Sequence, residues 1–340
     1  MGVESRFVLK ERPGSGGLAL QSVVVPDPLA ADVLIKIHSA SICGTDLHIY
    51  NWNDWAARTY HPPFRLGHEF AGKVIAVGPD SKAIQPGDHV TAETHIPCGH
   101  CNQCRLNRRH TCDNLQLFSR SGFGCFSDYT LVPEATLRVV PPGIPLDHAT
   151  IMEPLGIAVR AVTEAGVGGA NVLVLGAGPI GLFAIVAAKA YGAASIIATD
   201  LSDYRLDLAR QVGATASTNP HEGALAIPPA DVVIETTGSE AAFTQALGSV
   251  RKGARVVFAS LPEHPFSLDI TRHVVLREIT ISGVYGRRLD ETWIQVERLL
   301  ASHGFELARI LTHRLPLDSF QAAFALAASG NAGKVVLLPS

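Results

Sequence analysis

The sequence predicts an α/β protein with two domains, a mostly β domain followed by a doubly wound parallel sheet. In the first part, short β-branched runs are separated by Pro and Gly turns, which is typical of a compact β-barrel or sandwich. After Pro154, Ala, Gly and Val dominate, and apolar strand-like runs alternate with helical stretches. The 340 residues are enough for two hydrophobic cores.

The β-rich part extends over two stretches, Val23 to Ser39 and Phe70 to Val90. Turn-forming residues interrupt them at Pro26-Asp27-Pro28, Val77-Gly78-Pro79 and Gln85-Pro86-Gly87-Asp88. Runs of this length between turns predict a first domain that is mostly β, as a compact barrel or sandwich.

The second half opens with the apolar run 172–175, which suits a strand buried on both faces, followed by a helix over 182–191. Further strands are expected at 195–199, 231–235, 255–259 and 279–283. A helix at 320–328 and a strand at 334–338 are expected to return to the first domain. These expectations place the domains at 1–155 and 156–294, with a C-terminal segment at 295–340.

The composition excludes several classes of protein. Charged residues make up 17% of the chain and the net charge is -3, so the sequence offers no basic surface for nucleic acid. The longest apolar run, Ile180 to Ala190, is too short for a membrane span, and no secretion signal is evident. We therefore expect a cytoplasmic protein with a small-molecule ligand.

A glycine-rich motif, residues 176–181, directly follows the buried run 172–175 and opens the apolar helix. Such a turn can bind a pyrophosphate at a helix N-terminus. Asp200, at the end of the next expected strand, can accept hydrogen bonds from the adenosine ribose hydroxyls and repel a 2′-phosphate. This favours NAD, although Arg205 could contact adenine or a phosphate and allow some use of NADP. The motif consists of Gly176, Ala177, Gly178, Pro179, Ile180 and Gly181.

Four of the six cysteines crowd into a short segment with metal-ligand spacing. Four thiolates close a tetrahedral Zn²⁺ site that supports folding rather than chemistry. We expect His100 and His110, beside the cluster, to be surface residues, and Cys125 to be a small buried residue. The expected ligands are Cys98, Cys101, Cys104 and Cys112.

A second candidate zinc site combines Cys43 with His68-Glu69. A thiol, an imidazole and a carboxylate are the ligand types of catalytic zinc, and Thr45 and His48 are near enough in sequence to pass a proton. A lone Cys or His in an apolar chain is more often a core residue. The nucleotide motif favours the metal, because an NAD domain needs a partner that polarises an alcohol. Glu153 could be a ligand, could tune the proton path or could simply cap a helix.

Taken together, these motifs resemble the zinc-dependent medium-chain alcohol dehydrogenase superfamily over essentially the whole chain. Within it, the chain is most similar to the L-threonine 3-dehydrogenase subfamily. The residues that carry the narrower likeness are 42–52 (ICGTDLHIYNW), 93–96 (ETHI), 283–287 (GVYGR), 291–293 (ETW) and 333–336 (GKVV).

The resemblance implies a GroES-like catalytic domain, a Rossmann NAD-binding domain, and one catalytic and one structural Zn²⁺ per chain. Cys43, His68 and Glu69 would hold the catalytic zinc, with Glu153 exchanging on and off or acting through water. Thr45 and His48 would relay the alcohol proton through the cofactor ribose. His95 would line the substrate pocket, and members are typically homotetramers. The likeness adds these contacts with NAD: Ile180, Asp200, Arg205, Leu261, Val284 and Tyr285.

Two departures leave the substrate open. Ile157 stands where threonine dehydrogenases usually carry Asn, and the segment 115–124 differs from the subfamily pattern. The resemblance implies oxidation of L-threonine to 2-amino-3-oxobutanoate. A polyol or 2,3-butanediol dehydrogenase on the same scaffold is the alternative, and a non-enzymatic NAD(H)-binding redox sensor is a remote one.

Overall fold

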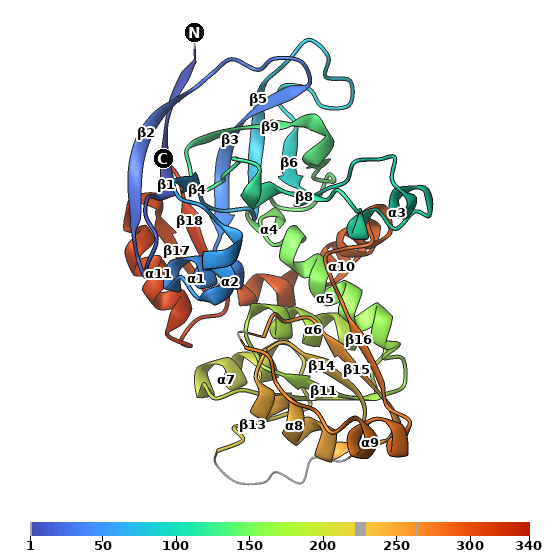
Figure 1. Cartoon of the computed structure of the whole chain (residues 1–340). Helices are drawn as coiled ribbons and strands as arrows, with labels where there is room; N and C mark the ends of the chain where they lie inside the picture. Colours follow the sequence, from blue (N-terminus) through green and yellow to red (C-terminus); the bar gives the residue numbers. More distant parts are fainter. Residues whose placement is uncertain (1, 222–228, 263) are drawn as a thin grey trace. The chain divides into compact units, whose positions relative to one another are not determined.

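The computed structural model describes residues 2–221, 229–262 and 264–340 and forms two compact units (Figure 1). Unit 1 contains the chain up to Pro154 together with His313–Ser329 and Lys334–Ser340, and unit 2 contains Leu155–Thr312 and Gly330–Gly333. The α/β fold class predicted from the sequence is confirmed.

Unit 1 is built mainly from β-strands. They are β1 Val3–Lys10, β2 Leu18–Val25, β3 Asp32–Ser41, β4 Phe64–Arg65, β5 Phe70–Val77, β6 His89–Ala92, β7 His95–Ile96, β8 Gln116–Leu117, β9 Tyr129–Pro133, β10 Leu137–Val139, β17 His313–Pro316 and β18 Val335–Leu338. The main sheet has the order β10-β6-β5-β3-β18-β17, with β9 also pairing with β3. A smaller sheet has the order β2-β1-β4, and β7 pairs with β8.

Strand β3 is the centre of unit 1, because it pairs with β5, β9 and β18. Its side chains Val33, Ile35 and Ile37 are buried. The C-terminal strand β18 runs antiparallel to β3, with Val336 opposite Ser41. The strand β18 therefore lies beside the end of β3, as Figure 1 shows.

Short helices connect the strands of unit 1. Helix α1 contacts both α2 and α11, and the rings of Tyr50 and Phe324 lie 5.3 Å apart between α1 and α11. The sequence reasoning did not anticipate α1 or α2, whereas α11 coincides with the predicted helix. The helices are α1 Gly44–Asn51, α2 Asp54–Thr59, α3 Asn102–Arg105, α4 Leu146–Ala149 and α11 Phe320–Ala328, with 3₁₀ turns η1 Arg109–Thr111, η2 Phe118–Arg120, η3 Glu134–Thr136 and η5 Leu317–Ser319.

Unit 2 contains a six-stranded parallel sheet. Its strands are β11 Asn171–Leu175, β12 Ser195–Thr199, β13 Ala216–Thr218, β14 Ala230–Glu235, β15 Val250–Phe258 and β16 Thr280–Gly283. The order is β13-β12-β11-β14-β15-β16, so the direction of winding reverses between β11 and β14. In sheets of this order, ligands bind beyond the carboxyl ends of the strands at that reversal. The predicted doubly wound sheet is confirmed.

Helices cover both faces of this sheet. Helices α6, α7 and α10 pack together, whereas Phe243 and Leu247 of α8 join a core cluster with Leu173 and Val233 of the sheet. The helices are α5 Met152–Ala165, α6 Pro179–Ala190, α7 Asp203–Val212, α8 Glu240–Ser249, α9 Ile270–His273 and α10 Leu289–Ile310, with the 3₁₀ turn η4 Val275–Arg277.

Helix α10 extends further than the expected domain limits. The sequence predicts a return to the first domain from residue 295, but α10 continues to Ile310 in unit 2, with non-helical backbone angles at His303. It stays in unit 2 because it packs on α6 and α7, and the return begins at His313. None of the helices in the described part of the chain combines the length and apolar character needed to cross a membrane.

Candidate active site

Three potential metal ligands come together in unit 1. Cys43 is the N-cap residue of α1, and His68 and Glu69 lie just before β5. One ligand atom from each lies within 4.8 Å of the other two. His68 is 8% exposed and Glu69 fully buried. The residues of the second predicted zinc site therefore form one cluster in space.

Gly67 allows the chain to present His68 and Glu69 to this cluster. Its φ angle is 89°, a left-handed conformation that L side chains rarely adopt. A Cβ atom at this position would lie 2.5 Å from Cδ1 of Phe126 and 2.8 Å from Sγ of Cys125. Both the backbone angle and the close packing require glycine before the two ligands.

Asp46 places a buried negative charge beside this cluster. One oxygen accepts a hydrogen bond from the Cys43 amide at 2.9 Å, and the other lies 3.7 Å from Nδ1 of His68. Burial raises the pKa of Asp46 to about 6. Burial also works to lower the pKa of His68, but Asp46 and then Cys43 outweigh it and raise that pKa well above its usual value. Buried charges of this kind are paired or coordinate a metal.

The donor set fits zinc. Thiolate, imidazole and carboxylate are its usual ligands, and catalytic sites use three protein ligands and keep a fourth position open. Nδ1 of His68 is buried without a hydrogen-bond partner among the described residues. Metal-ligating histidines normally pair their second ring nitrogen with a nearby group, and Asp46 is the closest carboxylate that could do so.

Glu69 has protein partners on both oxygens. Nζ of Lys334 lies 2.8 Å from Oε1 and 2.5 Å from Oε2, and the hydroxyl of Ser41 donates to Oε2. Lys334 is 1% exposed, so this is a fully buried ion pair. Nothing near Lys334 in the sequence indicates this role, because its partner lies 265 residues away.

Thr45 and His48 are one turn apart on α1, so they share a face of the helix. The amide of Asn53 lies 2.8 Å from Nδ1 of His48, and its oxygen accepts from the Ala56 amide at 3.0 Å. The His48 ring also meets the Trp55 ring edge-on at 6.1 Å. Asn53 thus holds His48 at Nδ1 and Trp55 packs against the ring, and neither residue was predicted from the sequence.

Glu153 and His95 are both buried beside Thr94. The Thr94 hydroxyl donates to Glu153 Oε1 at 2.7 Å, and the His95 amide donates to Glu93 Oε1 at 2.8 Å. Glu153 is not one of the side chains whose ligand atoms lie within 4.8 Å. Its charge nevertheless acts on His68, after the stronger effects of burial, Asp46 and Cys43.

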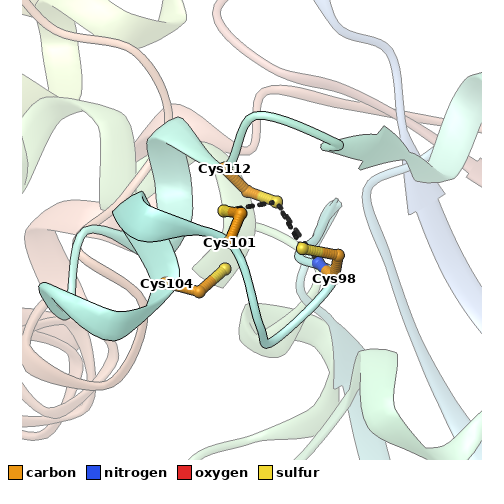
Figure 2. Close-up of side chains that lie close together, drawn as sticks. All are labelled: Cys98, Cys101, Cys104 and Cys112. Carbon is orange, nitrogen blue, oxygen red and sulfur yellow. Dashed lines mark hydrogen bonds between the residues drawn. The ribbon is translucent and has the colours of Figure 1, made fainter.

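The four-cysteine cluster forms on the loop around α3 and η1, and Figure 2 shows the four side chains pointing toward one another. Sγ of Cys112 lies 3.5 Å from Sγ of Cys98 and 3.7 Å from that of Cys101. Zinc–sulfur bonds of about 2.3 Å in a tetrahedron separate the sulfurs by about 3.8 Å, whereas a disulfide needs about 2.05 Å. All six cysteines are free thiols, so the spacing fits zinc and not disulfides.

Backbone amides of the loop prepare this cluster for a metal. The amides of His100 and Cys101 lower the pKa of Cys98 to about 6, and the Cys98 amide donates to Cys112 Sγ at 3.3 Å. Thiolates are the form that binds zinc. His100 is exposed as expected, but the expectation that His110 is a surface residue is wrong, because it lies within η1 and is only 8% exposed.

The three motif glycines of unit 2 have three different surroundings. Gly176 turns with a φ of 87°, and a Cβ there would lie 2.7 Å from Thr237. At Gly181 a Cβ would meet the Gly176 carbonyl at 1.9 Å, so helix and turn are in contact. Gly178 is the N-cap of α6 and has no atom within 4 Å of its Cβ position. The open side of the turn is thus the helix N-terminus, where a phosphate can approach.

Asp200 and Arg205 hydrogen-bond to backbone groups of the loops around this turn. Asp200 accepts hydrogen bonds from the amides of Ala177 at 2.7 Å and Ser202 at 2.9 Å. Nε of Arg205 donates to the Ala332 carbonyl at 3.2 Å. Asp200 is partly exposed and each of its oxygens has a further lone pair, so it can still accept from a ribose.

The other expected cofactor contacts follow later strands of the same sheet. Leu261 follows β15 and is 53% exposed, and Val284 and Tyr285 follow β16. At the end of β14, which lies between β11 and β15, the buried Glu235 accepts from the amides of Thr237 at 2.7 Å and Gly238 at 3.0 Å. Glu235, which the sequence reasoning missed, fixes the loop that packs on Gly176.

Comparisons with known proteins agree with these sites. Residues 30–142 match the family described as "Alcohol dehydrogenase GroES-like domain", and residues 179–302 match "Zinc-binding dehydrogenase". The chain is 42% identical to an L-threonine 3-dehydrogenase of Bacillus licheniformis, over 97% of this chain and 98% of the relative. It is 40% identical to one from Pyrococcus horikoshii, over 97% of both.

A solved structure gives a similar result for the fold. The 2R,3R-butanediol dehydrogenase of Bacillus subtilis superposes with a TM-score of 0.87, at 25% identity, over 99% of this chain and 100% of that one. The chain belongs to the zinc-binding medium-chain alcohol dehydrogenase superfamily. It is accordingly a zinc-dependent, NAD-linked dehydrogenase with a GroES-like first domain and a Rossmann second domain.

Proposed function

We propose that the protein oxidises L-threonine to 2-amino-3-oxobutanoate and reduces NAD⁺ to NADH with release of one proton. The supporting observation is the identity of about 40% with L-threonine 3-dehydrogenases, which extends over nearly the whole of both chains. Similarity across the full length includes both sites, whereas the butanediol dehydrogenase shares only 25% of its residues.

In this proposal Cys43, His68 and Glu69 hold the catalytic zinc. When bound, zinc lowers the pKa of the substrate hydroxyl and NAD takes up hydride from the adjoining carbon. The chain supplies a dry site, because His68 and Glu69 are buried. Excluding water strengthens every electrostatic interaction in the site.

Thr45 and His48 carry the substrate proton away in this proposal. Their positions one turn apart on α1 allow the Thr45 hydroxyl to receive the proton from the substrate. Thr45 then passes it toward His48 through the cofactor ribose. Asn53 orients the histidine ring for this step. Glu153 stays near the metal through Thr94 and tunes the proton path.

The cofactor contacts are proposed at the carboxyl edge of the parallel sheet. The open face at Gly178 receives the pyrophosphate, and Asp200 accepts from the adenosine ribose and disfavours a 2′-phosphate. Arg205 borders the adenosine side. The remaining proposed contacts are Gly176, Pro179, Ile180, Gly181, Leu261, Val284 and Tyr285.

His95 is proposed to line the substrate pocket, since it is buried next to Thr94 and Glu153. A 2,3-butanediol or polyol substrate is the second candidate. It is favoured by the TM-score of 0.87 with a butanediol dehydrogenase and by the departures at Ile157 and 115–124. Such a substrate would not need groups that bind an amino acid's charges.

We propose a homotetramer located in the cytoplasm. The edge strand β16 has exposed backbone, and apolar side chains near it are also exposed, with Val275 at 66% and Leu276 at 68%. An edge strand flanked by apolar surface pairs readily with a second copy. The free thiols agree with a reducing compartment.

A substrate panel tests the proposal. NADH formation is measured with L-threonine, D-threonine, L-serine, 2,3-butanediol and sorbitol, each at several concentrations. We expect the highest kcat/KM with L-threonine. A higher kcat/KM with butanediol or sorbitol would establish the second candidate, and sedimentation of the purified protein would test the tetramer.

A further inference from the structure

Lys334 is a fully buried cation at the catalytic metal site. It immediately precedes β18 and is 1% exposed, and its ammonium contacts both oxygens of Glu69, at 2.8 and 2.5 Å. A buried lysine is costly unless it is paired. Its place beside a metal ligand is therefore a specific feature and not a surface ion pair.

Strand pairing brings the residues of this arrangement together. β3 lies between β5 and β18, and Ser41 at the end of β3 faces Val336. The Ser41 amide donates to the Glu69 carbonyl at 2.9 Å, and its hydroxyl donates to Glu69 Oε2. Glu69 is thus fixed from two neighbouring strands, and the Lys334 contact depends on the C-terminal strand.

These contacts distinguish Glu69 from the other two ligands. The Ser41 hydroxyl donates to Oε2 of Glu69, and the Lys334 ammonium donates to Oε1 and lies 2.5 Å from Oε2, so both oxygens already have a protein partner. Because Lys334 contacts both oxygens, a metal ion that shares Glu69 would lie close to the Lys334 ammonium. The two cations then repel each other and compete for one carboxylate.

We propose that Lys334 is a positioning residue that restrains Glu69 and weakens zinc binding at the catalytic site. This inference rests on the proposed assignment of Cys43, His68 and Glu69 as the zinc ligands. In consequence, Glu69 is the one of the three ligands whose hold on the metal depends on a buried cation. The four-cysteine site has its own donors and is unaffected.

Lys334→Met tests this proposal, since it removes the charge and keeps much of the side-chain volume. Zinc affinity of the full chain is measured by competition with a chromophoric chelator, and the four-cysteine zinc serves as an internal reference. We expect the catalytic zinc to bind about tenfold or more tightly in the variant. Unchanged or weaker binding would overturn the proposal.

A double variant covers the case in which the unpaired Glu69 prevents folding. Lys334→Met combined with Glu69→Gln leaves no buried charge at this position. In the zinc-free protein it should unfold at a higher temperature than Lys334→Met alone, and it should bind zinc at least about tenfold less tightly than that single variant. Equal zinc affinities in the two variants would show that Lys334 does not act through Glu69.

Lys10→Met is the matched control. Lys10 is also fully buried, but its ammonium donates to the carbonyls of Gly14 at 2.6 Å and Gly16 at 2.5 Å. Zinc affinity should not change in this variant. If Lys10→Met tightened zinc binding as much as Lys334→Met, loss of a buried lysine in general would explain the result and the proposal would be wrong.

Cys43→Ser separates this inference from the ligand assignment. If this variant keeps the catalytic zinc, the proposed ligands themselves are wrong. If it loses the catalytic zinc while Lys334→Met leaves the affinity unchanged, the assignment stands and only the role of Lys334 fails.

Discussion

The two metal sites of unit 1 differ in how the chain assembles them. The four-cysteine site is local, since all its ligands lie between Cys98 and Cys112 and backbone amides of the same loop support the sulfurs. The Cys43 site is assembled from the start of α1, the segment before β5 and the residue that precedes the C-terminal strand. That residue, Lys334, lies 265 residues from Glu69 in the sequence.

This difference corresponds to a difference in chemistry. Four thiolates satisfy a tetrahedral zinc completely, so the local site can only stabilise the fold. The other site offers three mixed ligands, one of which is already shared with Lys334 and Ser41. Three protein ligands leave the fourth coordination position of a zinc ion open for a substrate, as a catalytic site requires.

Cys43→Ser should produce the largest effect on activity. Losing zinc removes several kcal/mol of transition-state stabilisation, so kcat/KM should fall by about a thousandfold or more. NADH binding, followed by fluorescence titration, should be almost unchanged because the proposed nucleotide site is in unit 2. Turnover that survives and still requires zinc would contradict the assignment of Cys43.

Cys98→Ser should reverse this pattern and act mainly on stability. We expect a loss of more than about 3 kcal/mol of unfolding free energy, a part of the roughly 10–16 kcal/mol that structural zinc supplies in zinc-finger peptides. Thermal unfolding and zinc content measure the effect. The control is Cys125→Ala, which removes a buried thiol outside both ligand sets and should leave the zinc content unchanged.

Asp200→Ala tests the nucleotide site independently of both metals. Loss of charged hydrogen bonds to the ribose should raise the ratio of NADP to NAD in kcat/KM by about tenfold. Asp200 also accepts from two amides, so Asp200→Asn is the matched variant that removes the charge and keeps an acceptor. An unchanged cofactor preference in both variants would exclude this role for the carboxylate.

Glu134→Gln should have the smallest effect, a small loss of unfolding free energy. Glu134 contrasts with Glu69 because hydroxyl and amide donors, not a buried cation, stabilise its charge. Glu134 binds the Ser81 hydroxyl at 2.5 Å and the Ala83 amide at 2.7 Å, and these contacts lower its pKa to about 2 from 4.5. Its stabilisation is complete above pH 4.5 and is lost as the pH falls toward 2.

The variant should cost about 1 kcal/mol at neutral pH, and the cost should shrink in that acidic window. The unfolding free energies of the wild type and the variant, measured at several pH values, test this expectation. A cost that stays constant down to the lowest pH would mean that the charge of Glu134 does not contribute.

Local patterns made much of the fold predictable. The strand at Ser195–Thr199 and the helix at Phe320–Ala328 fall where the sequence placed them, because apolar runs and turn residues specify them directly. The extent of helix α10 in unit 2 could not be predicted from local patterns, since α10 packs on α6 and α7, which are distant in sequence. The burial of His110 could not be predicted, because nothing near it in sequence indicates that its side chain is buried within η1.

The sequence by itself determined the chemistry of the sites, because ligand types and spacing are local: four thiols in one loop, a glycine turn after a buried strand, and Cys43 with His68-Glu69. Only the tertiary structure decided which charges surround them. Lys334 reaches Glu69, and Asp46 reaches His68, through strand pairing and helix placement. Contacts between distant segments depend on the whole fold, so no short pattern can encode them.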